Sequence, residues 1–277
     1  MTDAVQTTLG SVVSIWRYPV KSMLGEELNA AELTERGVSG DRAYALIDGS
    51  DGKVATAKNP RKWPNLFGFR AALVEPVAGR ESPSVRITLP DGTKAVSRQS
   101  DISEVLSGAL GREVTLRGAA GGRAAPAQSE EYWPDMEGLD HRDTVTEFTL
   151  PEGTFFDCAA VHLLTTATLD RLGELYPEGR FDVRRFRPNI VIAPAAGAKG
   201  FVENPWIGHM LAIGDVRLSV TGPCGRCVMT TLSQEDLPAD PGILRTAARH
   251  NQANVGVYVA VVRGGTIRRG DSVMLAA

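Results

Sequence analysis

Val257-Tyr258-Val259-Ala260-Val261-Val262 is the stretch of this sequence that most clearly sets the fold. Its β-branched and aromatic residues favour an extended strand over a helix. Three runs of the same kind occur in the second half of the chain, namely Asn189-Ile190-Val191-Ile192, Val216-Arg217-Leu218-Ser219-Val220 and Ser272-Val273-Met274-Leu275. Strands at this spacing are typical of a β-barrel, so we expect residues 126–277 to form one.

The first third of the chain also consists of short strand-like runs. Val12-Val13-Ser14-Ile15-Trp16 and Ala43-Tyr44-Ala45-Leu46-Ile47 are two of them, and the turn signal Asp48-Gly49-Ser50-Asp51-Gly52 follows the second. Such turns join antiparallel strands. The segment from Arg117 to Pro126 is rich in glycine and alanine without any period, which predicts a linker. We therefore expect a first, mostly antiparallel β domain over residues 1–118.

Helical periodicity is confined to three short segments. Apolar residues recur at helical spacing from Asp101 to Leu110 and from Thr166 to Tyr176. A third helix is expected over Ile243 to Asn251, after Pro241-Gly242. The chain is therefore predicted to be mainly β, with a few short peripheral helices.

Composition narrows the class of protein. The 277 residues are 43% hydrophobic and carry a formal net charge of −3, which provides a core but no electrostatic footprint for nucleic acid or an anionic membrane. A small-molecule partner is therefore expected. The opening residues 1–6 lack the basic and apolar regions of a signal peptide, and three cysteines do not suggest a disulfide framework. These features predict a cytoplasmic protein.

Two of the three cysteines stand in Gly222-Pro223-Cys224-Gly225-Arg226-Cys227. The arginine and the bent loop favour a thiolate, which prefers soft or high-valent metals. A thioredoxin-like dithiol is disfavoured because Val228-Met229-Thr230-Thr231 is a poor first helical turn, and structural zinc because no second ligand pair follows. Packing of both cysteines at a strand end is the plain alternative. Cys158 and the four scattered histidines are interpreted as packing or surface residues.

Cationic and polar side chains cluster at the predicted strand ends. Lys21 and Ser22 follow Tyr18-Pro19-Val20, and Arg42 precedes a strand. The segment Arg184-Arg185-Phe186-Arg187-Pro188-Asn189 places three guanidinium groups ahead of another strand, and such forks suit phosphate or carboxylate. A single arginine at a strand end is usually a solvated charge. Together with a thiol, however, the cluster indicates a phosphorylated ligand that carries a soft metal centre.

Nearly the whole chain resembles the MOSC proteins. Within this family it is most similar to those with an N-terminal β-barrel companion domain, such as the amidoxime reducing components. The motifs that carry the resemblance are Ile15-Trp16-Arg17-Tyr18-Pro19-Val20-Lys21-Ser22, Gly40-Asp41-Arg42, Arg185-Phe186-Arg187-Pro188-Asn189-Ile190-Val191-Ile192, Trp206 through Ile213-Gly214, and Cys224-Gly225-Arg226-Cys227 followed by Thr230-Thr231. The resemblance implies a mainly β, α+β fold with two β-barrel-like domains, over residues 1–118 and 126–277.

The resemblance also implies a molybdenum cofactor, a pterin (molybdopterin), bound between the two domains. In the family's pattern the second cysteine of the pair, here Cys227, is the metal ligand. The positions that match cofactor-holding residues of the family are Lys21, Ser22, Arg42, Arg185, Arg187 and Asn189. Asp157 matches an acidic position near the metal and is a candidate proton donor or water-orienting group. Thr165 and Thr166 are expected to contact the pterin.

The implied activity is that of a molybdenum-dependent oxidoreductase that reduces N-hydroxylated or N-oxygenated compounds. Because the chain has no four-cysteine cluster, electrons are expected from a separate ferredoxin, b-type cytochrome or flavoprotein reductase. Two alternatives stay open. Cys227 could carry a persulfide and act as a sulfur carrier or transferase, or the pocket could store the cofactor without turnover.

Overall fold

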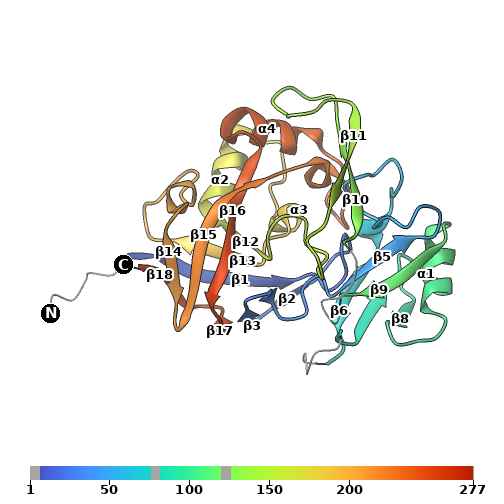
Figure 1. Cartoon of the computed structure of the whole chain (residues 1–277). Coiled ribbons are helices and arrows are strands. Elements are labelled where there is room, and N and C mark those ends of the chain that lie inside the picture. The colour runs from blue at the N-terminus through green and yellow to red at the C-terminus, as the bar shows by residue number, and fades with distance from the viewer. Residues whose placement is uncertain (1–6, 76–81, 120–125, 277) are drawn as a thin grey trace.

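The computed structural model describes residues 7–75, 82–119 and 126–276, and its largest element is a closed barrel of seven strands (Figure 1). Neighbouring barrel strands are antiparallel except for β12 and β13, which are parallel. In their order around the barrel, the strands are β13 (Ile190–Pro194), β12 (Val161–Thr165), β16 (Asn254–Arg263), β15 (Val216–Gly225), β14 (Met210–Ile213), β18 (Ser272–Ala276) and β1 (Thr8–Arg17). The four runs of the second half on which the barrel prediction rested all form barrel strands.

Strand β1 closes the barrel although it comes from the first third of the chain. It pairs with β13 on one side, with Val12 opposite Ile192, and with β18 on the other. Val12 and Ile15 lie in the barrel core, which valine, isoleucine and leucine side chains fill. The closing strand leaves no open edge between β13 and β18, where unpaired backbone groups would otherwise face solvent.

The first domain surrounds a separate core. Two small sheets and helix α1 (Ile102–Leu110) enclose it, and α1 confirms the helix predicted there. The sheets consist of β5 (Tyr44–Asp48) with β9 (Val114–Gly118), and of β6 (Arg70–Leu73), β7 (Val85–Thr88) and β8 (Lys94–Val96). Strand β2 (Glu26–Leu28) pairs with β1, whereas β3 (Ala30–Thr34) pairs with β4 (Gly37–Val38) and β17 (Gly265–Arg268). Both termini of the chain thus contribute to pairings that join the halves.

Three helices cover one end of the barrel (Figure 1). Helices α2 (Thr166–Leu175) and α4 (Pro241–Asn251) confirm the other two helix predictions, and the side chains of Thr165 and Asp240 cap them. The short α3 (Val183–Phe186) was not predicted, because four residues carry no helical period. Single 3-10 turns are η1 (Leu66–Gly68), η2 (Asn204–Trp206) and η3 (Val228–Thr231). No helix among the described residues has the length and apolar character needed to cross a membrane.

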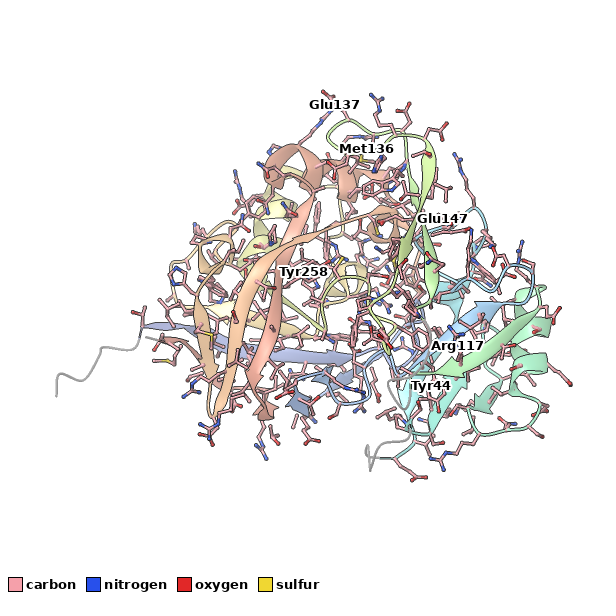
Figure 2. All side chains as sticks on the ribbon, viewed as in Figure 1. Tyr44, Arg117, Met136, Glu137, Glu147 and Tyr258 are labelled. Carbon is pink, nitrogen blue, oxygen red and sulfur yellow. The ribbon has the colours of Figure 1, made fainter. Side chains whose placement is uncertain are left out.

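A hairpin connects the first domain to the helical end of the barrel. Its strands are β10 (Gln128–Trp133) and β11 (Thr144–Thr149), and Ala127 at its base packs into a small core with β5. Met136, beyond the end of β10, packs against α4 and is labelled beside it in Figure 2. The hairpin was not predicted because both faces of β10 are polar. Residues 120–125 of the predicted linker lie outside the described residues.

Candidate functional site

The candidate site is a cleft between the first domain and the barrel. Lys21, Ser22, Arg42 and Lys58 line it from the first domain's side. The barrel side contributes the segment 155–159, the ends of α3 and β13, and the cysteine loop; its lining residues include Asp157, His162, Arg187, Asn189, Cys224, Arg226, Cys227 and Tyr258. The structure therefore brings together seven of the ten residues predicted for the site.

The turn after β1 buries a lysine and a serine at the floor of the cleft. Lys21 is 5% exposed, its Nζ donates to the carbonyl of Phe155 at 2.9 Å, and it forms an ion pair with Asp157. Burial lowers the pKa of Lys21, although Asp157 opposes that shift. Ser22 has a left-handed backbone, with φ of 64°, and its Oγ accepts from the amide of Ala57 at 3.1 Å. Both side chains are thus fixed by backbone groups before any ligand arrives.

Two guanidinium groups lie on the ring of Tyr18. The central carbon of Arg42 is 4.7 Å and that of Arg187 is 4.2 Å from the ring centroid. Burial lowers the pKa of Arg187 to about 10, and the nearby charge of Arg42 adds to that shift. Arg187 follows α3 in a left-handed conformation, and its Nη1 donates to the carbonyl of Met23 at 2.6 Å. This packing concentrates positive charge at one wall of the cleft.

Asn189 joins the strands beneath these arginines. Its Nδ2 donates to Asp41 Oδ2 at 2.9 Å and to the carbonyl of Trp16 at 3.2 Å, while its Oδ1 accepts from the amide of His162 at 3.1 Å. The carboxylate of Asp41 also pairs with Arg42. Asn189 therefore positions Arg42 through Asp41, in addition to lining the cleft.

The two cysteines of the motif have different surroundings. Cys224 lies near the end of β15 and is 1% exposed, and its Sγ accepts from Arg226 Nη1 at 2.9 Å. Cys227 precedes η3, is 8% exposed and packs with Met229 into the core of the first domain. The loop therefore crosses from the barrel to the first domain. The short 3-10 turn at Val228–Thr231 agrees with the weak helical character of that sequence.

Burial raises the pKa of the Cys227 thiol to about 12, and the charge of Glu131 adds to the effect. At Cys224 burial acts in the same direction, but His162 and Arg226 outweigh it and lower the thiol pKa to about 6. We expected Arg226 to favour a thiolate within this pair. The structure shows that it does so at Cys224. A metal cation would deprotonate a coordinating thiol at Cys227 regardless of that resting pKa.

Asp157 lies between two lysines. It pairs with Lys21, and its Oδ2 lies 3.5 Å from Lys58 Nζ. Burial favours the neutral acid, but the charges of Lys21 and Lys58 prevail and hold the pKa of Asp157 well below its usual range. The carboxylate is therefore ionised near neutral pH and accepts hydrogen bonds. Of the two roles expected for it, orientation of water fits this state and proton donation does not.

Arg185 lies outside the cleft although its motif predicted a cofactor contact. Its side chain is fully buried, and within the described residues all of its acceptors are backbone carbonyls. The acceptors are Arg180 at 2.9 Å, Thr230 and Leu232 at 3.2 Å each, and Pro238 at 2.7 Å. Because it holds the segment after the cysteine loop, Arg185 shapes the site without facing it.

Thr165 and Thr166 also lie away from the cleft. The Oγ1 of Thr165 caps α2 and donates to Glu203 Oε2 at 2.7 Å, and Thr168 donates to the same oxygen at 2.7 Å. Thr166 is the first residue of α2 and is half-buried. Both threonines stand at the start of a helix that packs on the barrel end, and the Thr165 hydroxyl caps that helix instead of contacting a ligand.

Glu203 gives a test of this buried cluster. It is 0% exposed, and burial raises the pKa of its carboxyl. A raised folded-state pKa means that the folded protein binds this proton more tightly, so stability from Glu203 is present at acid pH and lost as the pH rises. We expect Glu203→Gln, which retains an acceptor without charge, to gain stability relative to the wild type as the pH rises. Urea denaturation across pH would measure this, and a constant difference would contradict it.

Sequence reasoning missed two members of the cleft and misjudged two others. Lys58 occurs in a turn without any motif, and Tyr258 lies within a strand that reads as plain core. His162 was interpreted as a packing or surface residue, and it is buried but lines the cleft. Cys158 was expected to pack, yet it is exposed and lines the cleft. The sequence held no signal for these positions, because each depends on contacts between segments that are distant in the chain.

The chain matches two family models in sequence. Residues 9–128 match the MOSC N-terminal beta barrel domain, and residues 151–274 match the MOSC domain. It is 26% identical to mitochondrial amidoxime reducing component 2 of Rattus norvegicus, over 96% of this chain and 83% of that protein. It is 26% identical to mitochondrial amidoxime-reducing component 1 of Homo sapiens with the same coverage.

A further relative is longer than this chain. Molybdenum cofactor sulfurase of Oryza sativa subsp. japonica is 28% identical over 80% of this chain, which corresponds to 28% of that protein. Both family models and all three relatives agree with the resemblance drawn from the motifs and with a function related to the molybdenum cofactor. The chain belongs to the MOSC family, with an N-terminal MOSC β-barrel domain followed by a MOSC domain.

Proposed function

We propose that this protein binds a molybdenum–pterin cofactor in the interdomain cleft and reduces N-hydroxylated or N-oxygenated compounds with electrons from a separate donor protein. One observation carries the proposal. Five cationic side chains converge with the thiol of Cys227 in a single cleft. These cations are Lys21, Arg42, Lys58, Arg187 and Arg226.

The cleft residues fit an anionic, phosphate-bearing group with a soft centre. The cations exceed the carboxylates that line the cleft, where Asp157 is the acidic lining residue among those described. Arg226 Nε is buried without a hydrogen-bond partner in the described structure, so a donor is left over for a ligand. Such an orphaned group costs free energy until an acceptor reaches it. A thiolate at Cys227 would suit a molybdenum centre better than magnesium or calcium.

When bound, the molybdenum centre supplies the two-electron oxygen-transfer chemistry. The chain's own residues hold and screen it. Arg42 and Arg187 present planar forks for a phosphate, and Lys21 adds a third positive charge. Cys227 would ligate the metal, and its place in an apolar core limits access of water. The ionised Asp157 accepts hydrogen bonds and orients a substrate N–H or a water molecule.

Metal and turnover measurements test the proposal. Protein produced in a host that makes the pterin cofactor should contain close to one molybdenum per chain. With a reduced viologen dye as electron source, it should convert an amidoxime to the amidine. The dye removes any need to know the donor protein. Absence of molybdenum, or molybdenum without reduction of any N-hydroxylated compound, would contradict the oxidoreductase.

Sulfur transfer from a Cys227 persulfide is the alternative within the family. A free sulfur carrier needs an accessible, ionised thiol. Cys227 is 8% exposed, and burial raises its thiol pKa, so the protein without metal does not favour this role. Cyanide-labile sulfur on a metal-free protein would favour the carrier over the reductase.

Arg187 gives a prediction specific to cofactor binding. We expect Arg187→Gln to lower molybdenum and pterin content by about tenfold or more, since a charged hydrogen bond contributes roughly 1.5–3 kcal/mol. Glutamine retains a donor toward the carbonyl of Met23. Arg171→Gln is the matched control, because Arg171 is exposed on α2 and pairs only with Glu174 in the described structure. Equal cofactor content in both variants would contradict the role of Arg187.

A further inference from the structure

Three side chains on neighbouring strands form a polar cluster on the barrel side of the cleft. His162 lies on β12, Tyr258 on β16 and Cys224 on β15, and these strands are adjacent in that order. Figure 2 labels Tyr258 on its strand in the middle of the barrel wall. All three residues line the cleft, and none of them is among the residues proposed above to hold the cofactor or the metal.

The geometry of His162 fixes which ring nitrogen carries a proton. Its Nε2 lies 3.0 Å from the carbonyl oxygen of Val255. A carbonyl only accepts, so Nε2 is the donor and Nδ1 of the neutral ring is an acceptor. Nδ1 is buried and has no hydrogen-bond partner in the described structure, and the residue is 6% exposed. The cleft wall therefore contains a vacant proton-accepting position.

Gly256 provides the space for this ring. An ideal Cβ at Gly256 would lie 2.3 Å from His162 Nε2 and 2.5 Å from the carbonyl oxygen of Leu163. The residue also has φ of +81°, a conformation that favours glycine. The imidazole can therefore lie across β16 toward β15, where Cys224 is located.

Cys224 is surrounded by groups that exchange or stabilise a proton. Arg226 Nη1 donates to its Sγ at 2.9 Å, and His162 and Tyr258 lie close enough to interact with it, although no aligned hydrogen bond reaches Nδ1. His162 and Arg226 together overcome burial and lower the pKa of the thiol to about 6. The other ionisable groups that act on this cluster are Glu203 beside His162, Cys158 beside Tyr258, and Cys227 beside Arg226.

The proposed reduction needs protons that the other cleft residues do not provide. Conversion of R–NHOH to R–NH2 and water consumes two electrons and two protons. Asp157 is ionised, Lys21 is committed to its ion pair, and Cys227 would be a metal ligand. Lys58 and Tyr258 also line the cleft, but their pKa values are raised, so they release a proton less readily than the thiol of Cys224, whose pKa is lowered to about 6.

We propose that Cys224 and His162 form a thiol–imidazole pair that supplies a proton to the departing hydroxyl group. The assignment rests on the proposed function. The S–H or N–H bond of the pair breaks as an O–H bond of the product water forms, and Arg226 stabilises the thiolate that remains. The second proton comes from solvent, the two electrons come from the reduced donor protein, and water then reprotonates the pair.

The pair itself can be measured without cofactor. The thiolate absorbs in the ultraviolet, so a pH titration of the cofactor-free full chain carrying Cys158→Ser should show a step with a midpoint near pH 6. Adding Cys224→Ser should remove that step. Adding His162→Gln, which retains an N–H for the carbonyl of Val255, should raise the midpoint by about one pH unit or more. Absence of the step, or a midpoint unaffected by His162→Gln, would overturn the pair.

The role in proton supply is measured in the loaded protein. The turnover number should fall as the pH rises through the midpoint of the pair, because the donor must be protonated. In His162→Gln this fall should move to higher pH together with the thiolate step, while molybdenum content stays at the wild-type level. A fall that does not move would overturn proton supply. A thiolate step in a loaded protein that reduces no N-hydroxylated compound would refute the proposed function, and proton supply with it, but not the pair.

Discussion

Replacing Cys227 with alanine should abolish molybdenum retention and reductase turnover together. Residues that only support a ligand typically cost 10–100-fold in metal affinity when mutated, so loss of the ligand itself should cost about 100-fold or more. Cys227 lies in the loop that crosses between the domains. Cys158 and Cys224 also line the cleft, but neither belongs to the first-domain core in which Cys227 packs. Molybdenum per chain, measured by mass spectrometry, and turnover with a dye electron donor would check this.

Cys224→Ser is the matched control for the metal-ligand assignment. Cys224 Sγ already accepts from Arg226 Nη1, and the serine oxygen can accept the same hydrogen bond. This variant should therefore keep its molybdenum while its turnover falls, because the proton pair is lost. Cys158→Ser removes the exposed thiol and controls for nonspecific oxidation. If Cys224→Ser and Cys227→Ala lost molybdenum equally, Cys227 could not be assigned as the metal ligand.

Replacing Arg185 with methionine should cause the largest loss of stability. The fully buried guanidinium donates to four carbonyls around the segment that follows the cysteine loop. Methionine has similar length but no donors, so several partly or fully buried carbonyls would lose their partner at roughly 1–3 kcal/mol each. We expect a decrease of about 3 kcal/mol or more in the free energy of unfolding. Urea denaturation followed by circular dichroism would measure it.

Arg184→Met is the neighbouring control. Arg184 lies on the same short helix, but its side chain is 24% exposed and it pairs with Asp182, Glu235 and Asp236 at the surface. Exposed ion pairs contribute about 1 kcal/mol or less, so this variant should be much less destabilised. A smaller loss in Arg185→Met than in Arg184→Met would show that the carbonyls find other donors. Cofactor content in Arg185→Met should fall only as far as the protein unfolds.

Much of the fold could be predicted because the signals are local. The strand-like runs that became β13, β15, β16 and β18, and the helices α1, α2 and α4, all have a period or composition that depends on neighbouring residues alone. The hairpin β10–β11 had no such signal, since polar residues occupy both of its faces. Its position depends instead on ion pairs such as Lys53 to Glu130 and on Met136 packing against α4. The participation of β1 in the barrel likewise depends on edges that distant segments create.

The candidate site was predictable only where residues stand in motifs. Lys21, Arg42, Arg187 and Cys227 belong to motifs and meet in the cleft. Arg185 belongs to one of the same motifs, but its side chain donates to backbone carbonyls. The reason is that side chains close together in sequence project from different sides of the α3 helix. Sequence spacing gives the residue types but not the direction of each side chain.

The sequence by itself determined a mainly β chain with two cysteines, a set of cations and the order of motifs that relates it to its family. Only the tertiary structure decided that Arg226 supports the thiolate of Cys224 while Cys227 is buried, and that His162 and Tyr258 belong to the cleft. The physical reason is that strand composition follows from local chemistry, whereas burial and charge–charge interactions depend on through-space distances. Those distances are set when β12, β16 and β15 become neighbours in the barrel.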